Sequence, residues 1–227
     1  MGLIHANQFE LKVIKKIFWE LLFLLGLALS INALTYLNFD SSYGFLKIKA
    51  AAVASGKYLP FYYLHVLFGG LILFAGFIQV SKWFRTKWKS FHRGVGYFYV
   101  LSILFCAAPG GLGMSFFVDR GPMVLISFVL QSALWFYFTL NAFLKIKRGD
   151  VVAHELWMWR SFSLTLAAIT LRLYIFFSSY FFDLSQPMAY AIIAWASWLP
   201  NLILVEYFKG SLFASFKTKR HLHVQRS

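Results

Sequence analysis

The chain has 227 residues, of which 60% are hydrophobic, 21% aromatic and only 13% charged. A water-soluble domain of this size needs more charged side chains to cover its exterior, so the composition excludes an ordinary soluble protein and favours one solvated by lipid. The net charge is +14, but the basic residues flank apolar segments and no recognition motif accompanies them. We therefore expect no nucleic-acid partner.

Six apolar segments approach the length of about 20 residues that a membrane-spanning helix needs. In chain order they are 17–37, 61–80, 95–108, 122–144, 156–180 and 188–208. The third is short and ends at Pro109, Gly110 and Gly111, a combination that predicts a helix break. The sequence thus predicts an all-α, polytopic transmembrane bundle of about six spans (17–208). An N-terminal segment (1–16) precedes it and a basic tail (209–227) follows it.

The first segment also has features of a signal peptide, with Lys12, Lys15 and Lys16 before the apolar stretch and small residues near Ser30. We expect an uncleaved anchor, because the apolar stretch continues past Ser30 and Glu20 interrupts it. The single cysteine, Cys106, excludes an intramolecular disulfide and a cysteine metal cluster. We predict no metal site.

Basic residues concentrate on one side of the bundle if the six helices alternate. The segments 82–93 and 145–148, the N-terminus and the tail all carry them, and they all fall on that side. Positive residues stay cytoplasmic, so both termini are expected to face the cytoplasm of a bacterial inner membrane. The same basic segments predict the bilayer as a partner, with anionic lipids at the cytoplasmic loops.

Polar side chains recur at helical spacing on three segments, and positions 3, 4, 7 or 11 residues apart share one helix face. The three stripes are His65, Gly69, Gly76 and Gln79; His92, Gly96, Tyr99 and Ile103; and His154, Met158, Ser161, Thr165 and Arg172. Ionisable groups at such depths usually face the bundle interior or a partner. Plain helix packing and structural hydrogen bonding are the alternative interpretation of all three stripes.

The expected topology sorts the polar residues by depth. Those toward the cytoplasm are Gln79, His92, Arg93, His154, Arg160, Asn201 and Glu206, and those toward the outside are His65 and Arg172. We expect Glu206 to pair with Arg160 or Arg93. We expect Arg172 to be buried, with a backbone carbonyl, an acid such as Asp119 or Asp183, an anionic lipid or a ligand as its partner.

These residues resemble a family of bacterial predicted membrane proteins, domain-of-unknown-function family 2306. The matching motifs are His65-x3-Gly69 with Gly76-x2-Gln79, His92-Arg93-x2-Gly96, His154-x2-Trp157-Met158-x-Arg160-Ser161, Arg172, and Asn201 with Glu206. The resemblance covers the chain from the first helix to Gly210. It implies a multi-pass topology and draws attention to these positions, but it implies no activity.

Three functions fit the pattern. The polar cluster could bind or transport a small anionic or lipid ligand. Alternatively, His92 and His154 could be the axial ligands of a b-type haem, with Gly96 or Gly76 making room for the ring and Arg93 or Arg160 meeting its propionates. The third function is a non-catalytic assembly or sensory component. The sequence has no catalytic triad, phosphate-binding loop or zinc motif, so a hydrolase or ATPase is not expected, and whether the chain is an enzyme stays open.

The topology gives the first testable prediction. Fusions after Ser227 should be active only with a reporter that works in the cytoplasm, and fusions after Gly121 only with one that works in the periplasm. With both termini in the cytoplasm, 17 of the 22 basic residues lie on the cytoplasmic side or at its membrane boundary. A periplasm-dependent reporter that is active at Ser227 would contradict the topology.

Overall fold

The computed structural model describes residues 2–181 and 187–209. All regular elements within these ranges are helical. Their bounds are α1 Gly2–Leu34, η1 Thr35–Asn38, α2 Phe45–Ile48, α3 Ala50–Ala54, α4 Tyr58–Val80, α5 Lys82–Lys87, α6 Lys89–Ser102, η2 Ile103–Ala107, α7 Ala108–Ser115, α8 Pro122–Lys147, α9 Val151–Thr165, α10 Ala167–Ser178 and α11 Pro187–Ala196. A turn at 197–198 leads into a further helix at 199–209.

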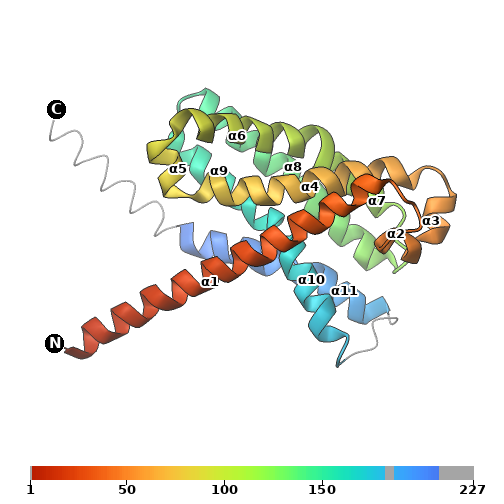
Figure 1. Ribbon diagram of the computed structural model, residues 1–227, viewed down its shortest axis with the longest axis horizontal. Helices are drawn as coiled ribbons and strands as arrows, with labels where there is room; N and C mark the ends of the chain where they lie inside the picture. Colours follow the sequence, from red (N-terminus) through yellow and green to blue (C-terminus); the bar gives the residue numbers. More distant parts are fainter. Residues whose placement is uncertain (1, 182–186, 210–227) are drawn as a thin grey trace.

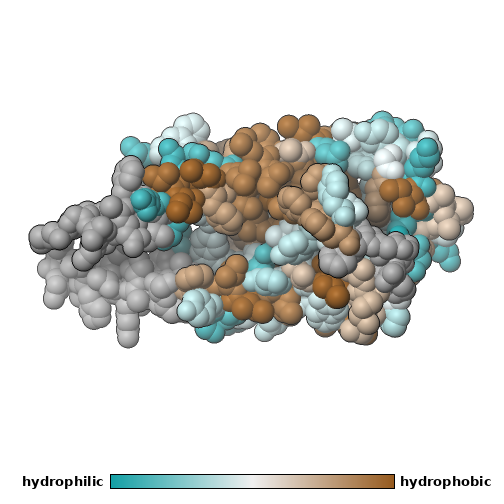
Figure 2. All heavy atoms as spheres, turned by 90° about the horizontal axis from the view of Figure 1, so that it is seen from below, coloured by the Kyte–Doolittle hydropathy of each residue, from teal (hydrophilic) through white to brown (hydrophobic). Residues whose placement is uncertain are grey.

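These helices form six spans that are long and apolar enough to cross a membrane. The spans are Lys12–Asn38, Tyr58–Val80, Lys89–Ser115, Pro122–Lys147, Val151–Ser178 and Met188–Lys209. The predicted all-α bundle of six spans is therefore confirmed. Figure 2 shows brown, hydrophobic side chains over the middle of one face, with most of the teal, hydrophilic ones toward its two ends.

The loops gather at two ends of the bundle. The basic end comprises residues 79–93, 145–155 and 206–209, and the tyrosine end comprises residues 35–62, 116–121, 172–181 and 187–190. At the basic end, Arg85 Nη1 donates a hydrogen bond to Glu155 Oε1 over 2.9 Å. At the tyrosine end, Lys49 Nζ donates to Asp119 Oδ1 over 2.6 Å. Each ion pair joins two segments that alternating helices bring to the same end, so both pairs support this connectivity.

Helix α4 lies at the centre of the arrangement, between α6 on one side and the long, oblique α1 on the other (Figure 1). Helices α8 and α9 form an antiparallel pair, joined by a short turn in which Gly149 adopts a φ of 75° that favours glycine. Helix α10 diverges from the rest toward the tyrosine end, and α11 packs against α8 (Figure 1). The bundle is thus compact around α4, α6, α8 and α9 and more open around α10.

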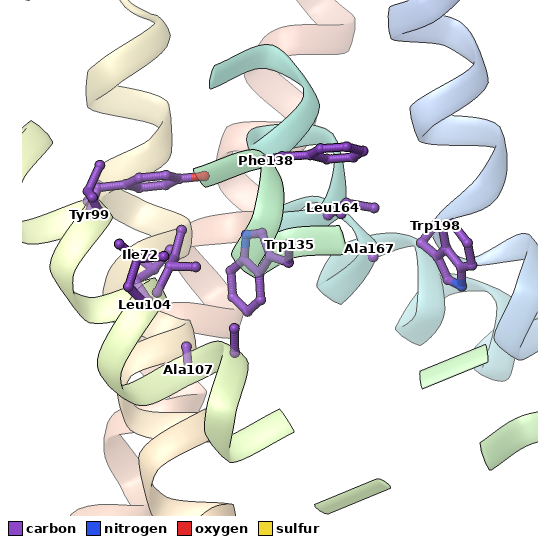
Figure 3. Close-up of a cluster of buried hydrophobic side chains, with 13 residues drawn as sticks. Ile72, Tyr99, Leu104, Ala107, Trp135, Phe138, Leu164, Ala167 and Trp198 are labelled. Carbon is purple, nitrogen blue, oxygen red and sulfur yellow. The ribbon is translucent and has the colours of Figure 1, made fainter. Parts of the chain in front are cut away.

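The largest buried apolar cluster fills the space between these central helices. Figure 3 shows Tyr99 and Leu104 directed toward Trp135 and Phe138 of α8. Trp198 completes the cluster from the last span, where its Nε1 donates to Ser127 Oγ over 3.0 Å. The core therefore connects the second, third, fourth, fifth and sixth spans.

The break predicted at Pro109 is wrong, because the third span continues to Ser115. Proline lacks an N–H, and within a regular α-helix its ring clashes with the carbonyl four residues earlier. Here a π-helical turn, η2, precedes the proline, and Pro109 occupies the first turn of α7, where its missing N–H is tolerated. The third segment, 95–108, looked short because the residues that follow it in α7 include three glycines, which do not count as apolar.

The glycines of α7 allow it to approach α4 closely. A Cβ atom on Gly110 would lie 2.7 Å from the His65 backbone nitrogen and 2.8 Å from the Phe61 carbonyl oxygen. A Cβ atom on Gly113 would overlap the ring of Phe61. Small residues have the same use at many contacts between membrane helices.

This contact gives the second prediction. Gly110→Ala should destabilise the folded chain by about 1–3 kcal/mol, because the new methyl meets backbone atoms that cannot move independently. Gly69→Ala is the matched control: no atom lies within 4 Å of its added methyl, and alanine favours a helix over glycine by about 0.5–1 kcal/mol. Thermal unfolding in detergent measures both. Equal midpoints for the two variants would contradict the close approach of α4 and α7.

Candidate functional site

His92 and His154 lie at the basic end, each in the first turn of its helix. Helix α6 begins after Trp88, whose non-helical backbone interrupts the chain, and His92 follows at its fourth position. Helix α9 begins after Asp150, whose carboxylate accepts a hydrogen bond from the Ala153 backbone N–H over 3.1 Å. The two helices run in the same direction, so both histidines are near the positive ends of helix dipoles.

Gln79, in the last turn of α4, positions the backbone of His92. Its Nε2 donates to the His92 carbonyl oxygen over 2.9 Å. Its Oε1 lies where a Cβ on Gly96 would approach within 3.3 Å, so a larger residue at that position would crowd the amide. Gln79 and His92, both expected toward the same side of the membrane, are therefore in contact, and the space beside Gly96 is occupied by Gln79.

The ring of His154 is oriented by α8. Its Nδ1 lies 2.8 Å from the Ala142 carbonyl oxygen. A carbonyl only accepts, so Nδ1 carries the hydrogen and donates it. The other ring nitrogen, Nε2, is left for a different partner, and it becomes a donor when the ring is protonated.

His92 carries an unsatisfied polar atom. The residue is half-buried, and its Nδ1 is inaccessible and makes no hydrogen bond to any residue that the structure describes. Its charged form would interact with Arg85 and His154, so these groups are close. A buried polar nitrogen without a partner costs about 1–3 kcal/mol, and such exceptions in a fold call for an explanation.

Two arginines near these histidines differ in their surroundings. Arg85 of α5 is held by Glu155, whose side chain is 18% exposed. Arg93 is exposed and, within residues 2–181 and 187–209, forms no ion pair. The histidines, Gln79 and Arg85 are thus brought together, with Arg93 at the margin.

Arg160 belongs to a separate cluster. Its Nε and Nη2 donate to the two carboxylate oxygens of Glu206, the second over 3.1 Å, and its guanidinium lies 4.4 Å from the centre of the Trp157 ring. Lys209 Nζ donates to Glu206 Oε2 over 2.8 Å. Of the two partners expected for Glu206, the structure pairs it with Arg160. This carboxylate pairs with both cations, and the Arg160 contact joins α9 to the 199–209 helix.

Asn201 has a structural set of partners. Its Nδ2 lies within hydrogen-bond distance of the Ser163 and Ser197 carbonyl oxygens, at 3.3 and 3.1 Å, and of Thr170 Oγ1 at 3.2 Å. These groups flank Leu166, where the fifth span passes from α9 to α10. Asn201 therefore satisfies polar atoms at that junction and does not reach the histidines.

His65 lies apart from the other two histidines, in the half of α4 nearer the tyrosine end. Its Nδ1 donates to the Ala107 carbonyl oxygen over 2.7 Å, at the end of the π-helical turn. Its ring meets the Trp135 ring edge-on, with 6.3 Å between centroids. His65 therefore joins α4, η2 and α8.

Arg172 is exposed, so the expectation that it is buried against the bundle is wrong. Helix α10 diverges from the bundle and leaves this side chain uncovered (Figure 1). Its Nη1 donates to the Ala168 carbonyl oxygen over 3.0 Å, one of the partners predicted for it. Asp183, another candidate, lies outside the described residues.

The sequence analysis missed a buried hydroxyl network between α6, α8 and α9. The Tyr99 hydroxyl is 3.2 Å from Ser161 Oγ and 2.8 Å from Thr165 Oγ1. On α8, Thr139 Oγ1 lies 2.7 Å from Ser161 Oγ, and Trp135 Nε1 donates to Thr165 Oγ1 over 3.2 Å. The signal was partly visible, because Tyr99, Ser161 and Thr165 belong to the histidine stripes. Nothing in the sequence marked Thr139 or Trp135.

This network sets the relative depth of the two histidines. Tyr99 lies seven residues after His92, and Ser161 lies seven residues after His154. Seven residues are close to two helical turns, so each histidine shares a face with its hydroxyl residue, about 10 Å away. Because α6 and α9 run in the same direction, the Tyr99–Ser161 contact brings His92 and His154 to the same level.

Within the part of the chain that the structure describes, no three His, Cys, Asp or Glu side chains lie close enough to hold a metal ion.

Comparison with known proteins gives one family. Residues 62–209 match the family described as "Predicted membrane protein (DUF2306)". No curated protein and no solved structure matches the chain. The matched region contains every residue discussed for the basic end.

The hydroxyl network gives the third prediction. Thr165→Val should destabilise the chain by about 1–3 kcal/mol, because it removes the partner of the buried Trp135 N–H. Tyr99→Phe should cost less, about 1 kcal/mol, because Ser161 and Thr165 keep other partners. Thr35→Val, at an exposed threonine, is the control. Thermal unfolding in detergent distinguishes them, and a Thr165→Val midpoint equal to the control would contradict the network.

Proposed function

Because the chain belongs to the DUF2306 family of predicted membrane proteins, whose description names no activity, we propose a function from its own residues: it binds a small oxyanion at the basic end, between His92 and His154. The oxyanion is a free anion or the acidic headgroup of a lipid. Both present the same negatively charged oxygens to the site.

The observation that carries the proposal is the Nδ1 of His92, which has no hydrogen-bond partner among the described residues. It is buried at the point where α6 begins, close to His154 and Arg85. A buried ring nitrogen without a partner is costly, and when it carries a hydrogen it can donate to an oxyanion oxygen, which would remove this cost. His154 supports the same site, since Ala142 fixes its ring and leaves Nε2 available.

The electrostatics of the basic end favour an anion. Two helix N-termini point their positive dipole ends at this region. The basic residues there are Lys82, Arg85, Lys87, Lys89, Arg93, Lys145, Lys147 and Arg148. The nearby described acids are Asp150, which caps α9, and Glu155, which holds Arg85. Glu155 also interacts electrostatically with His154, whereas the charged groups near His92 are Arg85 and His154, so a bound anion would supply negative charge beside His92.

Each residue has a defined part in the proposed site. His92 and His154 donate ring N–H groups to the anion, and the site binds more tightly when either ring is protonated. Gln79 holds the His92 backbone in place. Arg85 adds positive charge and is kept in position by Glu155. Transport across the membrane would additionally require the anion to leave toward the tyrosine end.

The haem alternative has less support. The free Nε2 of His154 suits an axial ligand. However, the glycines expected to make room for the ring face filled spaces: Gln79 lies against Gly96, and Phe162 lies against Gly76. Arg160, expected to meet a propionate, is paired with Glu206. These contacts do not fit a haem at that position, and a reduced-minus-oxidised spectrum without b-type bands is the expected result.

We further propose that the membrane is a bacterial inner membrane, with the basic end cytoplasmic. The positive charge of that end supports this orientation, and it also favours anionic lipids around the loops. An assembly or sensory component remains the alternative, in which the histidines would only join helices and no anion would affect stability.

The fourth prediction tests the oxyanion site. Purified protein in nonionic detergent should be stabilised by inorganic phosphate or by phosphatidylglycerol, by about 2.7 kcal/mol at a concentration 100 times the dissociation constant. Sodium chloride at the same ionic strength is the control. A response to phosphate would identify a free anion, and a response to phosphatidylglycerol alone would identify a lipid headgroup.

The variants decide whether the histidines form one site. His92→Gln and His154→Gln should each remove most of the stabilisation, and the double variant should add little, because residues that act together are not additive. Lys57→Gln, at the tyrosine end, should keep the full response. Stabilisation that is equal in wild type and in both histidine variants would overturn the proposal.

A further inference from the structure

A second cationic region lies at the tyrosine end, far along the bundle from the histidine site. Arg172 of α10 is exposed, and its one hydrogen bond within the described residues goes to the Ala168 carbonyl of its own helix. A guanidinium has five N–H donors, so most of its hydrogen-bonding capacity is unused. In the described ranges no carboxylate forms an ion pair with it.

The surroundings of Arg172 come from three other elements. Tyr36 of η1, Tyr62 of α4 and Tyr190 of α11 are near enough to interact electrostatically with its charge. Tyr36 and Tyr62 are buried, with 5.3 Å between their ring centroids. The arginine is therefore accessible from one side and bounded by tyrosines on the other, as expected for a ligand-binding position on the flank of a bundle.

A further cationic side chain lies beside Tyr190. The Arg120 guanidinium lies 5.5 Å from the centre of the Tyr190 ring. A nearby acid is Asp119, and Lys49 donates to it over 2.6 Å, which lowers the pKa of Asp119 below its usual value. Arg120 and Arg172 are thus both near Tyr190, and their positive charge favours an anion at this end of the bundle.

From these contacts we infer that Arg172, beside Tyr190 and Arg120, binds the phosphate group of a membrane phospholipid. Arginine suits this role because its planar fork donates two parallel hydrogen bonds to phosphate oxygens. Tyrosine hydroxyls add neutral donors at the same level. The inference is independent of the proposed histidine site, because it concerns the opposite end of the bundle.

The exposed face of α10 favours a lipid as the source of the phosphate. Tyr174, Phe176 and Phe177 of this helix are exposed, and the aromatic side chains near the end of a span lie at the headgroup level of a bilayer. Acyl chains would pack on this apolar face while the phosphate reaches Arg172. A free phosphate ion would gain nothing from these rings.

The test compares lipids with and without phosphate, using the full-length chain in nonionic detergent. Phosphatidylglycerol is titrated against monogalactosyldiacylglycerol, which has similar acyl chains and no phosphate, and against inorganic phosphate. The readouts are the thermal unfolding midpoint and the number of lipids retained in native mass spectrometry. All proteins carry His92→Gln and His154→Gln, so that a failure of the histidine site cannot affect the result.

Phosphatidylglycerol should bind at least about tenfold more tightly than the galactolipid, and Arg172→Gln should remove this preference. Arg93→Gln, which removes an exposed arginine from the opposite end, should leave it unchanged. If Arg172→Gln does not fold, Arg172→Lys decides the matter: it keeps the charge but loses the two-point contact, so the preference should shrink.

Three outcomes would overturn the inference. The first is equal binding of the two lipids by the protein that retains Arg172. The second is an equal rise of the unfolding midpoint with inorganic phosphate and with phosphatidylglycerol, since the acyl chains of the lipid would then contribute nothing to binding. The third concerns Asp183→Asn: this variant lowers the unfolding midpoint as much as Arg172→Gln does, and neither variant prefers phosphatidylglycerol. That result would mean that Arg172 pairs with the Asp183 carboxylate.

Discussion

Polar groups inside a bilayer have no water molecules to hydrogen-bond with, so other groups of the protein must be their partners. In this bundle the constraint is met by the hydroxyl network of α6, α8 and α9. Tyr99, Ser161, Thr165 and Thr139 are each at most 3% exposed, and every hydroxyl has a partner on another helix. Sliding one helix by a turn would separate several of these pairs at once. The network therefore fixes the helix register, and the register brings His92 and His154 together.

The other side of the bundle depends on close backbone approach. Glycines of α7 allow α4 to lie against it, and the π-helical turn before Pro109 ends at Ala107, whose carbonyl accepts a hydrogen bond from His65. A turn that departs from α-helical bonding needs such outside partners. His65 thus joins helices, whereas the other two histidines lie at the basic end, where the Nδ1 of His92 has no hydrogen-bond partner within the described ranges.

Much of the fold follows from the sequence, because a bilayer imposes simple rules on composition and length. The six spans, their order and the shared faces of the histidine stripes were all predictable from apolar runs and helical spacing. The continuation of the third span was not, since the glycines of α7 resemble a loop until their contact with α4 is known. The exposure of Arg172 was also hidden, because it depends on how far α10 diverges from its neighbours.

The candidate site was predictable in part for a similar reason. Spacing along one helix identifies a face, and the order of the spans identifies an end of the bundle. His92 and His154 were therefore expected at one end, and each lies in the first turn of its helix. Pairing across helices depends on rotation about each axis, which spacing does not give. Arg160 was therefore placed in the same cluster as the histidines, whereas it faces Glu206 and the last helix.

The most direct test of the histidine site is the distance between its ring nitrogens and a phosphorus nucleus. Protein labelled with ¹⁵N-histidine, in phosphatidylglycerol bilayers with phosphate present, can be examined by solid-state NMR for dephasing of the ring ¹⁵N signals by ³¹P. The account predicts strong dephasing of the signals that His92→Gln and His154→Gln remove, and none for His65, which is bonded to Ala107. Dephasing that is absent at His92 and His154 would contradict an oxyanion bound between them.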